Sequence, residues 1–278
     1  MVTLKEVFKN YVKQLQNNLI ENPEREVTLL LSFGLNIAAH NLHFQSNRAI
    51  SNSDLVRINQ LIGRREKKEP IAKIIGKKNF WNSSFLVSKA VLDPRPETEL
   101  LVETVLNYSG IKRKILDLGT GSGCIAISLA LEINDAKVVG VDISEVALRM
   151  ARKNSQLTGA NVCFLLSNWF QNVSETFDII VSNPPYVSEK AFKELPEDVK
   201  NYDPRIALIG GVDGLENYRR IACSFSSYLN KGGVGFFEIG CGQKKGVIDI
   251  FKLAGLSVFD IKQDLNGLDR VICVKKDA

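Results

Sequence analysis

The chain has 278 residues, of which 45% are hydrophobic, 8% aromatic and 24% charged. These proportions are those of an ordinary globular protein, so they exclude intrinsic disorder, collagen and a coiled-coil rod as descriptions of the whole chain. The formal net charge of +5 is modest for a dedicated nucleic-acid-binding protein. No apolar run approaches the ~20 residues of a membrane helix, and the first residues are charged where a signal peptide would be apolar. We therefore expect a cytoplasmic protein that does not enter a membrane.

The first 73 residues are predicted to form a domain of packed helices. Leu4, Val7, Tyr11 and Leu15 recur at helical spacing, and a second periodic stretch begins at Pro23. A third helix is expected from Leu55, with Ser53 and Asp54 in its N-cap region. Residues 74–92 place Gly, Asn and Ser between short apolar runs, which is typical of a β-hairpin linker.

Positive charge is concentrated in this front part of the chain. The first 90 residues hold 14 Lys and Arg against 7 Asp and Glu, whereas the remaining residues hold 22 against 24. Much of the excess lies in residues 64–78, a basic segment that includes Lys67, Lys68, Lys77 and Lys78. Such a segment can attract an acidic partner, or it can be a solvated helix end and turn.

Residues 93–278 alternate strands with helices, which predicts an α/β domain with a parallel, doubly wound sheet. The predicted strands are 114–118, 137–142, 162–166, 177–182 and 234–239, and the predicted helices are 97–108, 125–132 and 145–158. A final pair of strands, 257–261 and 270–274, is joined through Asn266 and Gly267 by a loop too short for a helical crossover. These last two strands should therefore be antiparallel.

A glycine-rich loop, Asp117-Leu118-Gly119-Thr120-Gly121-Ser122-Gly123, joins the strand 114–118 to a helix. Glycines permit a tight turn and the close approach of a ligand. The spacing is not the Gly-x-Gly-x-x-Gly of a dinucleotide fold. A carboxylate at Asp117 would repel phosphates and suits a cationic ligand, such as the amino group of S-adenosylmethionine.

Two further residues at predicted strand ends extend this candidate ligand site. Asp142 ends the strand 137–142, where an acid accepts hydrogen bonds from ribose hydroxyls. Trp169 follows the strand 162–166, and its ring could lie against an adenine or could be a core aromatic under a loop.

The loop Asn183-Pro184-Pro185-Tyr186 follows the strand 177–182 directly. Two prolines stiffen it and remove two N–H donors, Asn183 adds an acceptor on a short side chain, and Tyr186 offers a flat ring. This set suits a planar NH₂ group whose N–H bonds point at Asn183 Oδ1 and the Pro184 carbonyl. A nitrogen held there could face a sulfonium methyl in line. It needs no strong base in advance, because it becomes acidic only as the methyl arrives.

Cysteine and histidine usage gives no sign of a metal site or a disulfide framework. The five cysteines form no Cys-x-x-Cys pair, and we expect them to be small apolar residues of a reduced core. The only histidines, His40 and His43, lack a third ligand nearby, so we expect them to be structural or on the surface.

Together the two loops resemble the class I S-adenosylmethionine-dependent N-methyltransferases, whose fold is Rossmann-like with a mostly parallel seven-stranded sheet. More specific segments are similar to the HemK/PrmC family, the protein-(glutamine-N5) methyltransferases of peptide chain release factors. These segments are residues 69–72, 93–99, 207–215, 238–240 and 264–270. The resemblance implies methyl transfer from S-adenosyl-L-methionine, which leaves S-adenosyl-L-homocysteine. The acceptor would be the side-chain N5 of glutamine in the Gly-Gly-Gln motif of class 1 release factors, and the modification would modulate translation termination.

The resemblance also implies residue roles. The residues implied to bind the cofactor are Asp117, Leu118, Gly119, Thr120, Gly121, Asp142, Trp169 and Asn183. The residues implied to bind the substrate are Asn183, Pro184, Pro185 and Tyr186, and of these Asn183, Pro184 and Tyr186 are implied in catalysis. Glu97 would lie near the site. The family more often has Asp where Asn168 stands, so this chain keeps an acceptor for the adenine amino group but loses a charge.

Under this interpretation the basic front domain would dock the release factor, and we expect a monomer without a nucleic-acid partner. Two alternatives stay open. A nucleic-acid adenine N6-methyltransferase shares the Asn-Pro-Pro-Tyr loop, but it would need a nucleic-acid recognition surface. A non-catalytic adaptor could keep the fold for binding alone.

Overall fold

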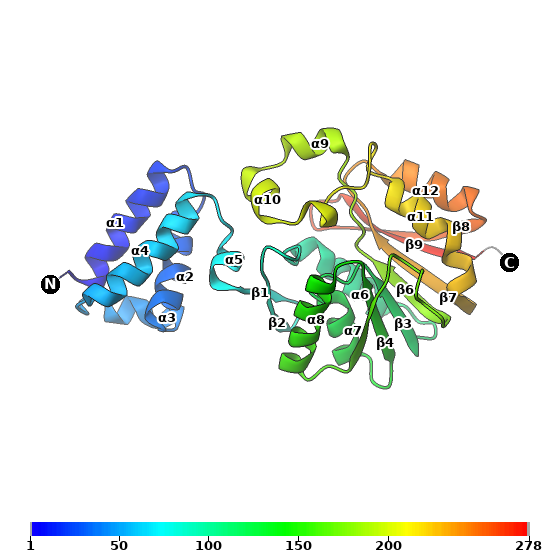
Figure 1. Cartoon of the computed structure of the whole chain (residues 1–278), viewed down its shortest axis with the longest axis horizontal. Coiled ribbons are helices and arrows are strands. Elements are labelled where there is room, and N and C mark those ends of the chain that lie inside the picture. Colours follow the sequence, from blue (N-terminus) through cyan, green and yellow to red (C-terminus); the bar gives the residue numbers. More distant parts are fainter. Residues whose placement is uncertain (1, 277–278) are drawn as a thin grey trace. The chain divides into compact units, whose positions relative to one another are not determined.

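The computed structural model describes residues 2–276 and contains two compact units (Figure 1). The first unit extends to Gly76 and includes the separate segment Pro196–Tyr202, and the second consists of Lys77–Leu195 and the residues from Asp203 onward. The sequence had suggested boundaries after residues 73 and 92. It gave no signal that Pro196–Tyr202, deep in the second half of the chain, packs with the first unit.

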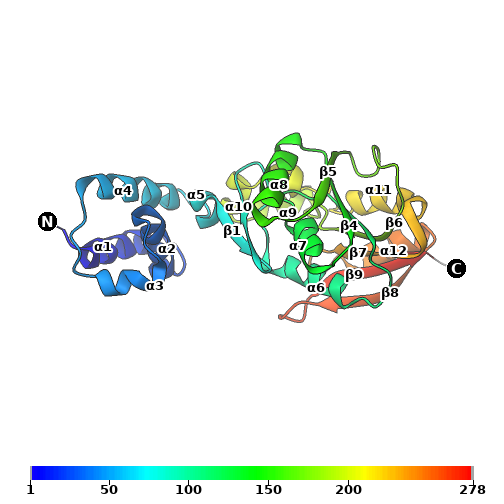
Figure 2. The same ribbon diagram turned by 90° about the horizontal axis from the view of Figure 1, so that it is seen from below.

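The first unit is a helical bundle, as predicted. Its elements are α1 (Leu4–Asn17), α2 (Pro23–Leu35), α3 (Ala39–Leu42), the 3-10 turn η1 (His43–Gln45), α4 (Asn52–Glu66), α5 (Ile71–Ile75) and α10 (Glu197–Tyr202). Helices α1, α2 and α4 pack together (Figure 2). Their apolar faces share one core that includes Leu15, Leu30, Leu31, Ile58 and Ile62.

The N-cap of α4 differs from the expectation. The Ser51 hydroxyl, rather than Ser53 or Asp54, caps the helix by accepting the Asp54 N–H at 3.1 Å. The helix therefore begins at Asn52, ahead of the first apolar residue from which we had placed it.

A β-hairpin opens the second unit and confirms the predicted element. Strands β1 (Lys77–Phe80) and β2 (Ser83–Leu86) pair antiparallel. Phe80 and Phe85 are fully buried with their rings edge to face, 6.1 Å apart, and both belong to a core of the second unit.

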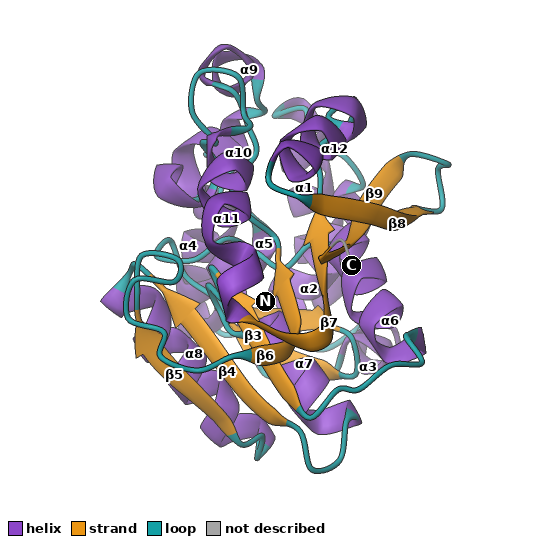
Figure 3. Cartoon of the chain, turned by 90° about the vertical axis from the view of Figure 1, so that its right-hand side faces the viewer, coloured by secondary structure: helices purple, strands orange, loops and turns teal. Residues whose placement is uncertain are grey.

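The second unit is built on a seven-stranded sheet in the order β5-β4-β3-β6-β7-β9-β8 (Figure 3). Its strands are β3 (Lys114–Leu118), β4 (Lys137–Asp142), β5 (Val162–Leu166), β6 (Phe177–Ser182), β7 (Leu229–Glu238), β8 (Leu256–Gln263) and β9 (Asp269–Lys276). Strands β3 to β7 run parallel to one another, and β9 runs antiparallel to both β7 and β8. This confirms the predicted fold, including the antiparallel final pair.

The start of β7 corrects the predicted strand 234–239. The strand begins at Leu229, because Leu229 pairs with Phe177 and Val234 pairs with Ile179 across a register shift. The bulged residues include Gly232 and Gly233, which precede the predicted strand but belong to β7 here.

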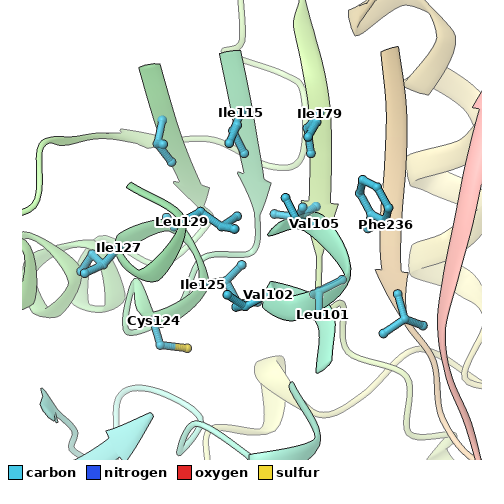
Figure 4. Packing of buried hydrophobic residues seen from close by; sticks show 14 of the residues in the cluster. Leu101, Val102, Val105, Ile115, Cys124, Ile125, Ile127, Leu129, Ile179 and Phe236 are labelled. Atoms are coloured by element: carbon cyan, nitrogen blue, oxygen red, sulfur yellow. The ribbon is translucent and has the colours of Figure 1, made fainter. Parts of the chain in front are cut away.

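Helices cover both faces of the sheet because the strand residues alternate between them. On one face α6 (Glu99–Asn107) and α7 (Cys124–Glu132) pack against Ile115 and Ile179 (Figure 4). On the other, α11 (Glu216–Phe225) and α12 (Lys244–Leu253) pack against Leu116 and Ile180. Helix α8 (Glu145–Thr158) packs beside α7.

The predicted helix list needs two corrections. The helix predicted at 97–108 starts as a 3-10 turn, η2 (Pro96–Thr98), before α6. Helices α11 and α12 had no predicted counterpart, and neither had α9 (Glu189–Glu194), η3 (Arg205–Ala207) or η4 (Ser226–Tyr228).

The cysteine prediction holds for only two positions. Cys124 and Cys273 are buried, and burial raises the pKa of each thiol to about 12. Cys163, Cys223 and Cys241 are exposed, which corrects their assignment to the core. His40 and His43 are exposed, and residues 2–276 contain no cluster of His, Cys, Asp and Glu that could hold a metal ion.

Within the same residues no single helix has the length and apolar character to cross a membrane. The segments Pro23–Leu35 and Ala39–Gln45 meet the criteria of length and composition only when they are taken together as one bent pair.

Candidate active site

The parallel strands deliver their carboxyl ends to one edge of the sheet, and the loops that leave those ends line a common cavity. The residues named in the sequence analysis that line this cavity are Gly119, Gly121, Asp142, Asn168, Trp169, Asn183 and Pro185. It is also lined by residues outside the prediction, among them Val91, Leu92, Ser144, Ile206, Asn217 and Arg220. The tertiary fold thus brings together residues from four different strand ends.

The glycine-rich loop forms an open floor for this cavity. Gly119 and Gly121 have φ angles of 71° and 56°, which glycine adopts without strain. A Cβ added to Gly121 would meet only the Gly119 carbonyl oxygen, at 4.0 Å, so the space above the loop is free. The loop is tied to the end of β4, because the Gly121 N–H donates to Asp142 Oδ2 at 2.8 Å.

Asp142 is held by backbone donors on both of its oxygens. Its Oδ1 accepts from the Ser144 N–H at 2.8 Å, in addition to the Gly121 bond on Oδ2. Burial raises the pKa of this carboxyl, and the backbone N–H donors oppose the rise. Each oxygen keeps a further lone pair for a ligand hydroxyl.

Asp117, Leu118 and Thr120 lie beneath the loop and do not line the cavity. Asp117 is completely buried; its Oδ2 accepts from Thr120 Oγ1 at 2.6 Å, and its Oδ1 has no hydrogen-bond partner within the described residues. Burial raises the pKa of Asp117 to about 7. In this structure these three residues support the loop from below, and their implied contact with a ligand stays a prediction.

Trp169 belongs both to the margin of the core, beneath α11 and α12, and to the lining of the cavity, and its contact with an adenine stays a prediction. The ring lies over the glycine-rich loop, 3.7 Å from where a Gly119 Cβ would be. The residue adopts a left-handed φ of 52°, and Ser167 Oγ donates to its carbonyl at 2.7 Å.

The Asn-Pro-Pro-Tyr loop is held from outside by residues that sequence reasoning missed. Asn217 Nδ2 donates to the Pro185 carbonyl at 2.7 Å, and Gln243 Nε2 donates to the Tyr186 carbonyl at 2.8 Å. Both partners belong to segments whose helices were not predicted. In the sequence, the only indication near these two residues was that the segments 207–215 and 238–240, which precede them, are similar to the HemK/PrmC family.

Asn183 presents its amide with a defined orientation. Its Nδ2 donates to Thr98 Oγ1 at 3.0 Å. No hydrogen bond within residues 2–276 engages Asn183 Oδ1 or the Pro184 carbonyl. Both oxygens of this loop therefore lack an internal partner, but only Asn183 lines the cavity, since Pro184 is buried; the predicted grip on an NH₂ group stays a prediction.

Tyr186 and Glu238 form a buried pair behind the loop. The Tyr186 hydroxyl donates to Glu238 Oε1 at 3.3 Å. Burial and the nearby Glu238 raise the pKa of Tyr186 far above its usual range, so the phenol stays protonated. Burial likewise raises the pKa of Glu238 to about 7. Pro184 and Tyr186 do not line the cavity, and Glu97 is exposed and also lies outside its lining.

Comparison with known proteins agrees with this geometry. Residues 77–198 match the family model of the methyltransferase small domain, and residues 6–76 match that of the PrmC N-terminal domain. A solved ribosomal protein L11 methylase from Lactobacillus delbrueckii aligns with a TM-score of 0.51 at 20% identity, over 67% of this chain and 83% of its own. A methyltransferase from Pyrococcus furiosus aligns equally well, over 70% and 86%. The fold and the family match define a class I methyltransferase, a class that uses S-adenosylmethionine.

Curated relatives narrow the class further. A release factor glutamine methyltransferase of Geobacter sulfurreducens is 38% identical over 254 residues, which are 91% of this chain and 89% of the relative. One from Agrobacterium fabrum is also 38% identical, over 95% of this chain and 94% of the relative. The chain belongs to the release factor glutamine methyltransferase family.

Proposed function

We propose that this chain methylates the side-chain N5 of glutamine in the Gly-Gly-Gln motif of class 1 peptide chain release factors, with S-adenosyl-L-methionine as the donor, and thereby modulates translation termination. The observation that carries the proposal is that Asn183, which lines the cavity, donates through Nδ2 to Thr98 and leaves Oδ1 without a partner among the described residues, on a loop fixed by Asn217 and Gln243. Membership of the family supports the same substrate.

The lining residues fit S-adenosylmethionine. The open floor at Gly119 and Gly121 leaves room for the methionine part. Asp142 has spare lone pairs for two ribose hydroxyls, and the half-buried Trp169 offers a ring face to the adenine. Asn168, exposed on the cavity wall, can accept from the adenine amino group without a charge.

The protein's own contribution is orientation rather than proton abstraction. When bound, the cofactor supplies an electrophilic methyl group on a sulfonium. Asn183 Oδ1 and the Pro184 carbonyl accept the two N–H bonds of the substrate amide and fix the direction of its nitrogen. Orientation of this kind supplies up to ~7–11 kcal/mol of a barrier in the best cases. Tyr186, kept protonated by its burial beside Glu238, donates to that carboxylate and supports the loop from behind rather than acting as a base.

The decisive experiment is incubation of the purified chain with S-adenosylmethionine and purified class 1 release factor, followed by mass spectrometry of the tip peptide. The proposal expects a gain of one methylene on the glutamine of Gly-Gly-Gln. Methylation of adenine in nucleic acid would support the N6-methyltransferase alternative, since an exocyclic amino group offers the same two N–H bonds. Cofactor binding without transfer to either acceptor would indicate an adaptor.

A further inference from the structure

A buried hydrogen-bond chain connects Asn183 to a carboxylate at the end of β7. Asn183 Nδ2 donates to Thr98 Oγ1 at 3.0 Å, and Thr98 Oγ1 donates to Glu238 Oε2 at 2.6 Å. Thr98 is 2% exposed and Glu238 is 1% exposed, so water does not compete for these bonds. This series of hydrogen bonds joins residues from η2, from the Asn-Pro-Pro-Tyr loop and from the strand β7, which are far apart in the sequence.

The chemistry of the three groups determines which of them donates and which accepts in each of these hydrogen bonds. An ionised carboxylate only accepts, so Glu238 requires the Thr98 hydroxyl to donate to it. The Thr98 oxygen is then left to accept, and it accepts from an N–H of Asn183. An amide whose NH₂ faces Thr98 must turn its Oδ1 to the opposite side. A hydroxyl without this carboxylate could instead donate to Asn183 Oδ1 and stabilise the flipped amide.

We propose that Thr98 and Glu238 are positioning residues that fix the amide orientation of Asn183, so that Oδ1 rather than Nδ2 meets the N–H bonds of the acceptor amide. This inference rests on the proposed function and adds to it the reason why Asn183 acts as an acceptor. A flipped Asn183 would place its own N–H groups against those of the substrate and would lose a hydrogen bond in the methyl-transfer step.

Glu238 is held in place from several sides. The Tyr186 hydroxyl donates to its Oε1, and the Tyr218 hydroxyl donates to its backbone carbonyl at 2.7 Å. The positive charge of Arg270 favours the ionised carboxylate, whereas burial and the charge of Glu97 oppose ionisation. An assay at about pH 8.5 keeps the carboxylate charged, because its pKa is about 7.

The test compares Thr98→Val with Thr98→Ser and with a matched control, Thr104→Val. Valine keeps the shape of threonine but removes the hydroxyl, and serine restores the hydroxyl. Thr104 is also a buried threonine close by in the chain, but its hydroxyl donates to the Leu100 carbonyl, away from the cavity. Each variant is assayed on whole release factor, and its rate is divided by the number of S-adenosylhomocysteine sites measured by calorimetry.

We expect Thr98→Val to lower kcat per binding site roughly tenfold, the loss of about one hydrogen bond, with KM for the release factor changed less than twofold. Thr98→Ser should recover most of the rate, and Thr104→Val should match the wild type. The inference is wrong if Thr98→Val keeps its kcat per site, or if Thr104→Val loses as much. Failure of the wild type to methylate release factor would instead overturn the proposed function.

Discussion

Asn183 illustrates how a single residue acquires a role from its neighbours. Its side chain could present either an oxygen or an NH₂ group to a substrate, and the bond to Thr98 selects the oxygen. Pro184, which follows it, adds a carbonyl in a backbone segment that cannot rotate about φ. Under the proposed function, the loop would therefore act through oxygen atoms whose positions are fixed before a substrate arrives.

We expect Asn183→Ala to lower kcat for release factor methylation by about 10²–10³-fold, the range seen when one group that stabilises a transition state is removed. Affinity for S-adenosylhomocysteine, measured by calorimetry, should change far less, because other residues form most of the cavity. Asn79→Ala on the exposed side of β1 serves as the control and should keep full activity. A variant at 183 that retained more than a tenth of the rate would contradict the acceptor role.

Asp117 is a second residue whose environment predicts a measurable effect. Its pKa is raised by burial to about 7, so the folded protein binds its proton more tightly than the unfolded chain does. The stabilising contribution is therefore complete below the unfolded pKa of ~4 and declines as the pH rises toward 7. Between pH 5 and pH 8 the wild type should lose a few kcal/mol of unfolding free energy relative to Asp117→Asn.

Urea unfolding of both proteins across this pH range measures the difference. The asparagine of the variant keeps an oxygen for the Thr120 hydroxyl but cannot titrate, so only the wild type should carry the slope. A difference between the two proteins that is independent of pH would show that Asp117 is ionised throughout.

At the scale of elements, the Asn-Pro-Pro-Tyr loop depends on the segment Leu208–Gly214. The Val187 N–H donates to the Leu208 carbonyl at 2.8 Å, and the Gly210 N–H donates to the Val187 carbonyl at 2.9 Å. Gly210 has no room for a side chain, because a Cβ would lie 2.6 Å from both the Pro185 and the Gly214 carbonyl oxygens. The glycines that marked this segment in the sequence thus permit the close approach of two backbones.

This packing predicts opposite effects at two glycines. Gly210→Ala should displace the Pro185 carbonyl, destabilise the protein by about 1–3 kcal/mol and lower kcat/KM. Gly63→Ala, in the interior of α4 where an added Cβ meets nothing within 4 Å, should stabilise it by about 0.5–1 kcal/mol and leave methylation unchanged. Thermal unfolding and steady-state kinetics measure both changes, and equal behaviour of the two variants would contradict the packing argument.

At the scale of the whole molecule, the cavity and the basic segment are distributed differently over the two units. The sheet unit holds the whole cavity, and the lysine-rich segment 64–78 begins in the helical unit and ends in the hairpin. Part of that segment is structural, because Lys68 Nζ donates to the Asn18 and Leu19 carbonyls and Arg64 pairs with the buried Glu69. We propose that the remaining charge docks the release factor.

Reversing the charge of Lys67, Lys77 and Lys78 to Glu, and leaving the structural Lys68 in place, should raise KM for whole release factor with little change in kcat, and the effect should weaken as salt rises. The control carries the same change in net charge at three exposed lysines, Lys5, Lys9 and Lys13. Circular dichroism should check the fold of both proteins. Equal methylation of an isolated Gly-Gly-Gln peptide and of the whole factor would contradict a docking role.

The sequence by itself determined the class of fold and the main motifs. Strands β3 to β6, together with the antiparallel order of the last two strands, follow from local apolar runs and from loop length. The two loops of the cavity were visible because glycine and proline act on the backbone at their own positions. These are local effects, and a single chain segment contains all the information they need.

Only the tertiary structure decided which partners complete the site. Thr98 and Glu238 are separated by 140 residues in the chain yet share a hydrogen bond, and although both lie in segments similar to the HemK/PrmC family, nothing local indicated that they pair. In the same way, no pattern in the sequence singled out Asn217 or Gln243, which the fold places against the Asn-Pro-Pro-Tyr loop. A hydrogen bond between side chains depends on positions in space, and those positions are fixed by the packing of helices on both faces of the sheet.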